Sequence, residues 1–212
     1  MIELQRRRSN APTSVYAVFV CAVGFALGIL TVFAQGWLPQ ELGSLANSSG
    51  SWALIAFVLA LLAASRGSAA VFGCLALVTL LLGYVIGGEA RDITSSTALI
   101  TFWGLAAVVA GPILGLCAHW TKTEGGYLAA VGTGVMCGVL IGEGVYGLSY
   151  IADTTYSPYW WGEIAVGVVL LGYVASRRLR ELKPAAAAVV CSLVVAAAFV
   201  GIYSQDLIAL FP

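Results

Sequence analysis

Charged residues are scarce in this chain. Asp, Glu, Lys and Arg together make up 9% of the 212 residues, whereas 60% of the residues are hydrophobic and the mean hydropathy is +0.96. A soluble domain cannot hide that much apolar surface, but a polytopic membrane protein exposes it to lipid. The composition therefore excludes an ordinary soluble protein. A net charge of zero also leaves no basic surface for nucleic acid.

The sequence motifs of common enzyme classes are also missing. There is no glycine-rich phosphate loop, no H-E-x-x-H, no G-x-S-x-G and no Asp-rich segment of the kind that holds magnesium on a diphosphate. The five cysteines form no C-x-x-C pair, and the single histidine, His119, is expected beside the membrane interface. We therefore expect no metal and no cofactor, and we do not expect ATP-driven or phosphoryl chemistry.

No Lys or Arg lies within a long apolar stretch. The absence of lysine excludes a retinal Schiff base, and the absence of any basic residue argues against the transport of anions.

What the chain does contain is apolar stretches of the length that crosses a bilayer, about 20 residues each. The seven stretches cover residues 15–34, 50–65, 69–87, 98–118, 126–150, 160–176 and 185–205. The sequence therefore predicts an all-α fold, a polytopic membrane protein whose seven transmembrane helices form one bundle. We expect residues 1–212 to form a single integral membrane domain. The second and sixth stretches are short, so we expect them to extend into the membrane interface.

The basic residues predict the orientation of this bundle. If the N-terminus is cytoplasmic, all of the ten Lys and Arg residues except Arg91 fall in cytoplasmic segments. This distribution follows the positive-inside rule. The sequence thus predicts a cytoplasmic N-terminus and an outer C-terminus, in a multi-pass protein of the bacterial cytoplasmic (inner) membrane.

The fifth stretch holds the one carboxylate that we expect deep in the bilayer, Glu143. Glycines at positions 134, 138 and 142 repeat every four residues, so they predict a stripe where a neighbouring backbone packs closely. Tyr146 and Tyr150 follow Glu143 on roughly the same side of the helix. An acid at such depth normally faces a cavity or a partner. The alternative is that Glu143 only bonds to a Tyr or Ser of a neighbouring helix.

The leading hypothesis is a cofactor-free membrane cyclase acting on a lipophilic, prenylated or terpenoid small molecule. A carboxyl group in a dry site favours its uncharged form, so Glu143 would protonate an alkene or epoxide. Glu163 or Asp206 would be its partner carboxylate, with Glu89 a further candidate. Aromatic faces would stabilise the developing carbocation. The residues predicted to bind the substrate are Tyr84, Glu89, Trp103, Tyr146, Tyr150, Trp161 and Tyr203.

Two other classes remain open. A small-molecule transporter, or the substrate-binding membrane subunit of one, is favoured by weakly repeated helical hairpins, by Pro112 and by acidic residues gathered near the predicted outer ends. That acidic end suits a cationic or neutral vitamin-like solute. The third class is a purely structural or immunity-type membrane protein, in which cysteines and glycines serve packing alone.

Parts of the sequence resemble a known pattern. Residues 42–84, including Ser51-Trp52-Ala53-Leu54 and Leu82-Gly83-Tyr84, are similar to an uncharacterised family of small polytopic bacterial membrane proteins. The segments Gly111-Pro112-Ile113-Leu114-Gly115 and Gly142-Glu143-Gly144 resemble later blocks of that family. In size, helix number and acidic residues the chain also resembles the seven-helix membrane terpene cyclases. That second resemblance concerns architecture only, so it transfers no catalytic residue.

Overall fold

A computed structural model describes residues 13–205, which fold almost entirely into helices; no strand occurs in this range. The elements are α1 (Thr13–Trp37), the 3-10 helix η2 (Gln40–Asn47), α2 (Ser49–Ala60), α3 (Arg66–Glu89), α4 (Thr97–Thr123), α5 (Gly126–Tyr150), α6 (Ser157–Arg178) and α7 (Leu182–Tyr203). Asp206 lies outside the described residues, so its predicted role stays a prediction.

Six of these helices are long and apolar enough to cross a membrane, and they match six of the predicted stretches. The second stretch differs. The sequence predicts one helix over residues 50–65, but α2 has only 12 residues and is bent by 56° from η2. At 1.5 Å per residue, α2 is about 18 Å long, too short for a hydrocarbon core of about 30 Å. The protein has seven spans only if η2 and α2 count as one broken span.

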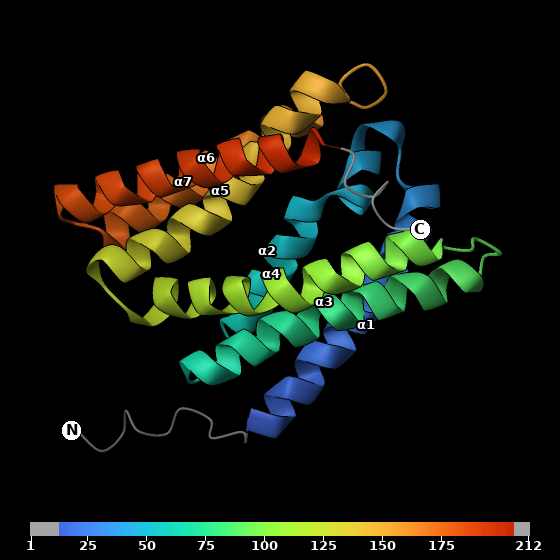
Figure 1. Ribbon diagram of the computed structural model, residues 1–212, viewed down its shortest axis with the longest axis horizontal. Helices are drawn as coiled ribbons and strands as arrows, with labels where there is room; N and C mark the ends of the chain where they lie inside the picture. The colour runs from blue at the N-terminus through green and yellow to red at the C-terminus, as the bar shows by residue number, and fades with distance from the viewer. Residues whose placement is uncertain (1–12, 206–212) are drawn as a thin grey trace.

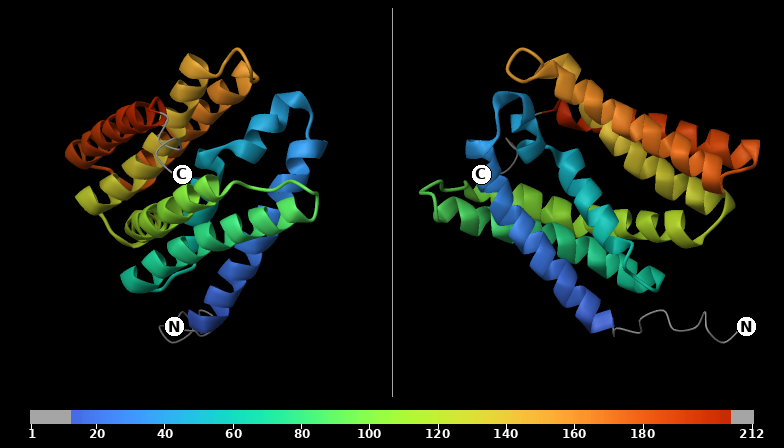
Figure 2. Two further views of the ribbon diagram at one scale, coloured as in Figure 1. Left: turned by 45° about the vertical axis from the view of Figure 1, so that its right-hand side comes forward. Right: turned by 180° about the vertical axis from the view of Figure 1, so that it is seen from behind.

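The helices form two groups (Figure 1). In one group α3 packs against both α1 and α4, and in the other α5 packs against both α6 and α7. Helix α2 lies between the groups and contacts α3, α4 and α5. Figure 2 shows the same division from two further sides, with α1 crossing α3 obliquely. We call these the α3 group and the α5 group.

The predicted glycine stripe on α5 is confirmed, because it is where α7 approaches most closely. A Cβ atom at Gly134 would lie 2.6 Å from Cys191 Cβ, and one at Gly138 would lie 2.6 Å from Val195 Cβ. Both distances are shorter than any real contact, so only glycine allows this spacing. Small residues thus join the helices of each group, as they do in membrane helix pairs generally.

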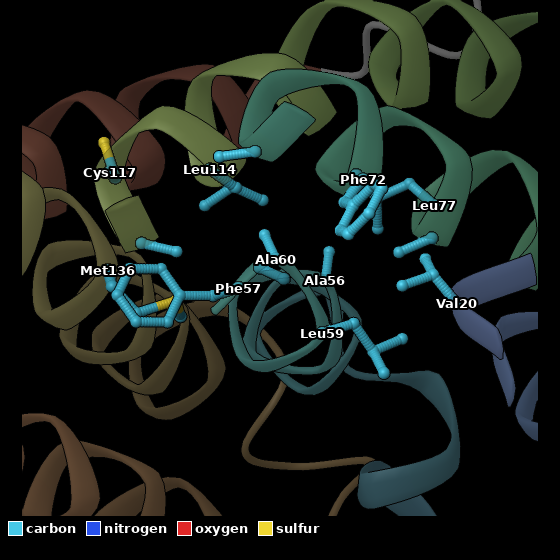
Figure 3. Close-up of a cluster of buried hydrophobic side chains, with 14 of the residues drawn as sticks. Val20, Ala56, Phe57, Leu59, Ala60, Phe72, Leu77, Leu114, Cys117 and Met136 are labelled. Atoms are coloured by element: carbon cyan, nitrogen blue, oxygen red, sulfur yellow. The ribbon is translucent and has the colours of Figure 1, made fainter. Parts of the chain in front are cut away.

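The largest core cluster surrounds α2. Its side chains Ala56, Phe57 and Ala60 are buried among residues of α3, α4 and α5, such as Phe72 and Met136 (Figure 3). A helix that is apolar on every side is expected to be buried on every side. Helix α2 therefore packs between the two groups.

One end of the bundle collects basic side chains. Arg66 pairs with Glu124 at 2.6 Å, and Lys122 Nζ donates to the carbonyl oxygen of Leu61 at 2.6 Å. Arg178 donates to the carbonyl oxygen of Lys122. Lys122 and Arg178 thus satisfy carbonyl groups that helix C-termini leave unpaired. We call this the basic end; here α4 turns into α5 through Gly125 and Gly126, the latter with φ +56°.

Large apolar side chains remain on the outer surface of the bundle. On α6 and α7, for example, Val169 is 69% exposed and Leu193 is 61% exposed. Monomeric soluble proteins rarely show apolar patches of this extent. The exposed surface therefore suggests a lipid bilayer environment and a multi-pass membrane protein.

Candidate functional site

The structure brings two of the predicted acids together. Glu143 on α5 and Glu163 on α6 are only 5% and 7% exposed. Ser48 Oγ lies 2.8 Å from Glu143 Oε2 and 3.2 Å from Glu163 Oε1. Because a hydroxyl group has a single proton, Ser48 donates to one of the two carboxyl groups at a time. We call Glu143 and Glu163 the acid pair.

The acid pair lies at the N-terminus of α2. Ser48 caps this helix, since its side chain accepts from the backbone N–H of Ser51 at 3.0 Å. Glu143 Oε1 accepts the backbone N–H of Ser49 at 2.8 Å, and Glu143 Oε2 accepts the backbone N–H of Gly50. The first N–H groups of a helix have no partner within it and carry partial positive charge. Glu143 is thus held as anions are held at helix N-termini.

Gly50 is the residue that lets both acids approach α2. A Cβ atom at this position would lie 2.6 Å from Glu143 Oε2 and still closer to Glu163 Oε1. Any larger residue would push the carboxyl groups away. The sequence Ser48-Ser49-Gly50-Ser51 therefore supplies a capping hydroxyl, two free N–H groups and the space for two side chains.

The acid pair has no basic partner. In residues 13–205 the one ion pair joins Arg66 and Glu124 at the basic end. Two carboxyl groups this close, without a cation, disfavour simultaneous ionisation. Glu143 accepts three hydrogen bonds, whereas Glu163 Oε2 is buried and receives no donor. Glu143 therefore has the hydrogen bonds of a carboxylate, whereas Glu163 receives a donor on only one of its two oxygens.

A hollow of about 590 Å³ opens beside Glu143, at the end of the bundle opposite the basic end. Its wall includes the ends of α1 and α7 and the loop after α5, and it is lined with polar side chains such as Gln35, Asn47 and Thr155. Glu143 lies in this wall, but Glu163 does not. We call this space the polar hollow.

A second hollow of about 520 Å³ adjoins the first, between the α3 and α5 groups. Its lining is almost wholly apolar and comes from α2, α3, α4, α5 and α7. The two hollows share the residues Asn47, Ser49, Phe102, Trp103, Ile202 and Tyr203. We call this second space the apolar hollow, and the two together the chamber.

Aromatic rings surround the point where the hollows meet. Tyr203 donates to or accepts from Ser49 Oγ at 2.6 Å, and its ring stacks on Phe199 with centroids 4.1 Å apart. The ring of Tyr146 lies edge-on to Tyr203 at 5.6 Å and stacks on Tyr150 at 5.3 Å. Tyr203 thus connects the α2 N-terminus to the aromatic wall.

The predicted site residues fall into two sets. Glu143, Trp103, Tyr146 and Tyr203 line the polar hollow, and Tyr84 lines the apolar hollow, where it contacts Trp52 edge-on at 5.8 Å. The others do not line the chamber: Glu163 lies behind Glu143, while Glu89, Tyr150 (58% exposed) and Trp161 (63% exposed) face outward. The predicted catalytic role of Glu163 and the predicted substrate-binding roles of the other three stay predictions.

The residues predicted to form the site do not include Ser48, Gly50 or Trp160. Trp160 is 4% exposed and donates from Nε1 to Thr155 Oγ1 at 2.8 Å. It is part of the wall of the polar hollow, whereas its neighbour Trp161 is not. The signal for the first two was present. A Ser/Gly-rich segment directly before an apolar stretch is typical of a helix N-terminus.

Metal chemistry finds no support in the arrangement. Over residues 13–205, no three His, Cys, Asp or Glu side chains gather in a way that could hold a metal ion. What the site can do is hold a proton on the acid pair and offer a carboxylate oxygen, hydroxyl groups and aromatic faces to a molecule in the chamber.

Comparison with known proteins leaves the function open. No curated protein and no solved structure matches the chain. A family of unknown function, DUF6518, does match it, over residues 7–208. This agrees with the resemblance to an uncharacterised family of membrane proteins, whereas the likeness to terpene cyclases gains no shared motif. Because the match spans nearly all 212 residues, the chain belongs to the family of unknown function DUF6518.

Proposed function

We propose that the protein binds a small molecule in the chamber and acts as a membrane transporter, or as the substrate-binding membrane subunit of one. The observation that carries this proposal is the short helix α2, whose N-terminus meets Glu143 at the wall of the chamber. Binding sites of many transporters are formed by such discontinuous helices, at the interface between two groups of helices. The chamber has this position between the α3 and α5 groups.

The hydrogen bonds of the acid pair favour binding over acid catalysis. A proton donor must direct its O–H at the substrate. Glu143 lies in the chamber wall, yet it accepts three hydrogen bonds, which suits a carboxylate and not a proton donor. Glu163 is the better proton holder, but it does not line the chamber. The pair suits a proton that is exchanged when the chamber changes its occupant.

The orientation belongs to the same proposal: the N-terminus and the basic end are cytoplasmic, the C-terminus is outside, and the membrane is the bacterial cytoplasmic one. Support comes from Arg66, Lys122 and Arg178, which gather at one end as the positive-inside rule requires. The polar hollow would then open toward the outside. Alkaline phosphatase fused to the C-terminus should be active and a fused green fluorescent protein dark; the reverse result contradicts the orientation.

Membrane terpene cyclase remains a second candidate because of the apolar hollow. Aromatic residues such as Tyr84, Trp103 and Phe199 line it, and it adjoins the hollow that Glu143 borders. Such faces can stabilise a carbocation. In this case a lipophilic prenylated substrate would lie in the apolar hollow, and the acid pair would have to rearrange to deliver its proton.

One experiment separates the two candidates. The purified protein in nanodiscs is incubated with a bacterial metabolite and lipid extract, washed, and its retained molecules are identified by mass spectrometry; proteoliposomes then test their uptake. Enrichment of an unchanged solute, lost in Glu143→Gln and kept in Glu41→Gln, supports transport. The control removes the same charge from an exposed position at the same end of the bundle. A new isomer of a prenylated compound supports cyclisation. If neither result is obtained, both candidates are contradicted.

A further inference from the structure

The chamber has a single charge. Among the residues that the structure describes, Glu143 is the only charged side chain lining either hollow. Within residues 13–205 no Lys, Arg or His forms an ion pair with it, and the partial charge of a helix N-terminus, roughly +0.5, offsets only part of a full negative charge. The chamber wall is therefore negative on balance.

Glu143 still has room for one more donor. Its Oε2 accepts hydrogen bonds from Ser48 and Gly50, but its Oε1 accepts only the N–H of Ser49. Each carboxylate oxygen can accept about two. Because Glu143 lines the polar hollow, this remaining position on Oε1 is the one that a ligand N–H group would use.

Glu163 does not offset the charge of Glu143, because it is itself a carboxyl group and does not line the chamber. Its side chain is more than nine-tenths buried, and its Oε2 receives no donor. Buried polar atoms without a partner are rare, and each one calls for an explanation. For Glu163 the neighbouring carboxyl group of Glu143 is a hydrogen-bond partner, so this oxygen does not by itself call for a cation.

The rest of the chamber matches an organic cation and not a metal ion. Trp103, Tyr146 and Tyr203 line the polar hollow, and aromatic faces attract ammonium groups at a distance of up to about 6 Å. The adjoining apolar hollow, of about 520 Å³, lies within the range of small-molecule pockets, about 300–1,000 Å³. Its lining is almost wholly apolar, so it suits an apolar body better than a bare ion.

We propose that the substrate of the chamber is a small organic cation, a protonated amine with an apolar or aromatic body. Its ammonium group donates to Glu143 Oε1 in the polar hollow, and its body lies in the apolar hollow. This inference rests on the proposed function, because it names the class of solute that the binding protein takes.

Three probes of one shape and different charge test the inference. They are 2-(2-naphthyl)ethylamine, 2-(2-naphthyl)ethanol and 2-naphthylacetate, titrated calorimetrically into the full-length protein in nanodiscs. We expect the amine to bind about tenfold or more tightly than the alcohol, a difference of about 1.4 kcal/mol or more. We expect no binding of the carboxylate. Equal binding of amine and alcohol, or no binding of the amine, overturns the inference.

Variants locate the effect. Glu143→Gln should lose the preference for the amine but keep weak binding of the alcohol, whereas Glu41→Gln should behave as the unchanged protein. Trp103→Leu is a second variant in case Glu143→Gln does not fold, and it should weaken the amine more than the alcohol. An unchanged preference for the amine in folded Glu143→Gln or in Trp103→Leu overturns the inference. Binding of the alcohol alone would be consistent with the proposed binding of a small molecule. It would refute only the inference that this molecule is a cation.

Discussion

Replacing Gly50 by alanine tests the architecture of the acid pair directly. The new methyl group would lie 2.6 Å from Glu143 Oε2 and closer still to Glu163 Oε1. Both carboxyl groups must then move away from the N-terminus of α2. The backbone N–H of Gly50 remains in the variant, so the change is one of space and not of hydrogen-bonding groups.

The cost follows from the bonds that Glu143 Oε2 makes. It accepts from Ser48 and from Gly50, and each hydrogen bond to a charged group contributes about 1.5–3 kcal/mol. Losing both costs about 3–6 kcal/mol, while alanine in a helix gains about 1 kcal/mol over glycine. The net loss is about 2–5 kcal/mol. For a chain of this length it lowers the melting temperature by roughly 4–20 °C.

The matched control is Gly43→Ala, because a Cβ atom at Gly43 would meet nothing within 4 Å. Gly43 belongs to η2 at the same end of the bundle, and its replacement should change stability by less than about 0.5 kcal/mol. Tryptophan fluorescence of the protein in detergent gives the melting temperatures. If Gly50→Ala is as stable as Gly43→Ala, the carboxyl groups do not lie against α2 and the site is wrong.

Three further changes test the packing and the charges, each by the same melting measurement. Ser48→Ala should lower the stability by about 1–3 kcal/mol, because it removes both a helix cap and a donor to the acid pair. Ser48→Thr should restore part of this stability. Equal losses in the two variants would contradict the capping role. Gly138→Val should cost about 1–3 kcal/mol or more, since its Cβ would lie 2.6 Å from an α7 carbon, whereas Gly162→Val meets open space and should not. Arg66→Ala should cost less than about 1 kcal/mol, because its side chain is 59% exposed in its ion pair; a larger loss would show that the basic end is more rigid than this exposure implies.

The helices were predictable because hydrophobicity dominates the sequence of a membrane protein. The predicted fifth stretch, residues 126–150, coincides with α5. The end of α2 was not predictable. Residues 61–64 read Leu-Leu-Ala-Ala and carry no breaker, so the local sequence favours a longer helix. The helix ends at Ala60, and Lys122, 61 residues further along the chain, caps the carbonyl of Leu61.

The candidate site was predictable only in part, for a similar reason. Glu143 stood out because it is one charge within a glycine-rich apolar stretch. The choice between Trp160 and Trp161 depends on the neighbouring helix, where Gly147 leaves space for one ring; a Cβ there would lie 2.6 Å from Trp160 Cε3. Ser48 could be recognised as a helix cap, but its bonds to Glu143 and Glu163, 95 and 115 residues away, could not be predicted. Contacts at that separation leave no local pattern.

The glycine corner between α4 and α5 has a mechanical consequence. Gly125 and Gly126 join the two groups at the basic end, no atom would obstruct a Cβ at either position, and Gly126 has a φ of +56°. Within each group the glycine contacts between helices are close, so we expect each group to move as a rigid unit. A rotation of a few degrees about Gly125 and Gly126 would barely change the corner itself. At the opposite end of the bundle it would widen or narrow the opening of the chamber by ångströms, with α2 between the α3 and α5 groups.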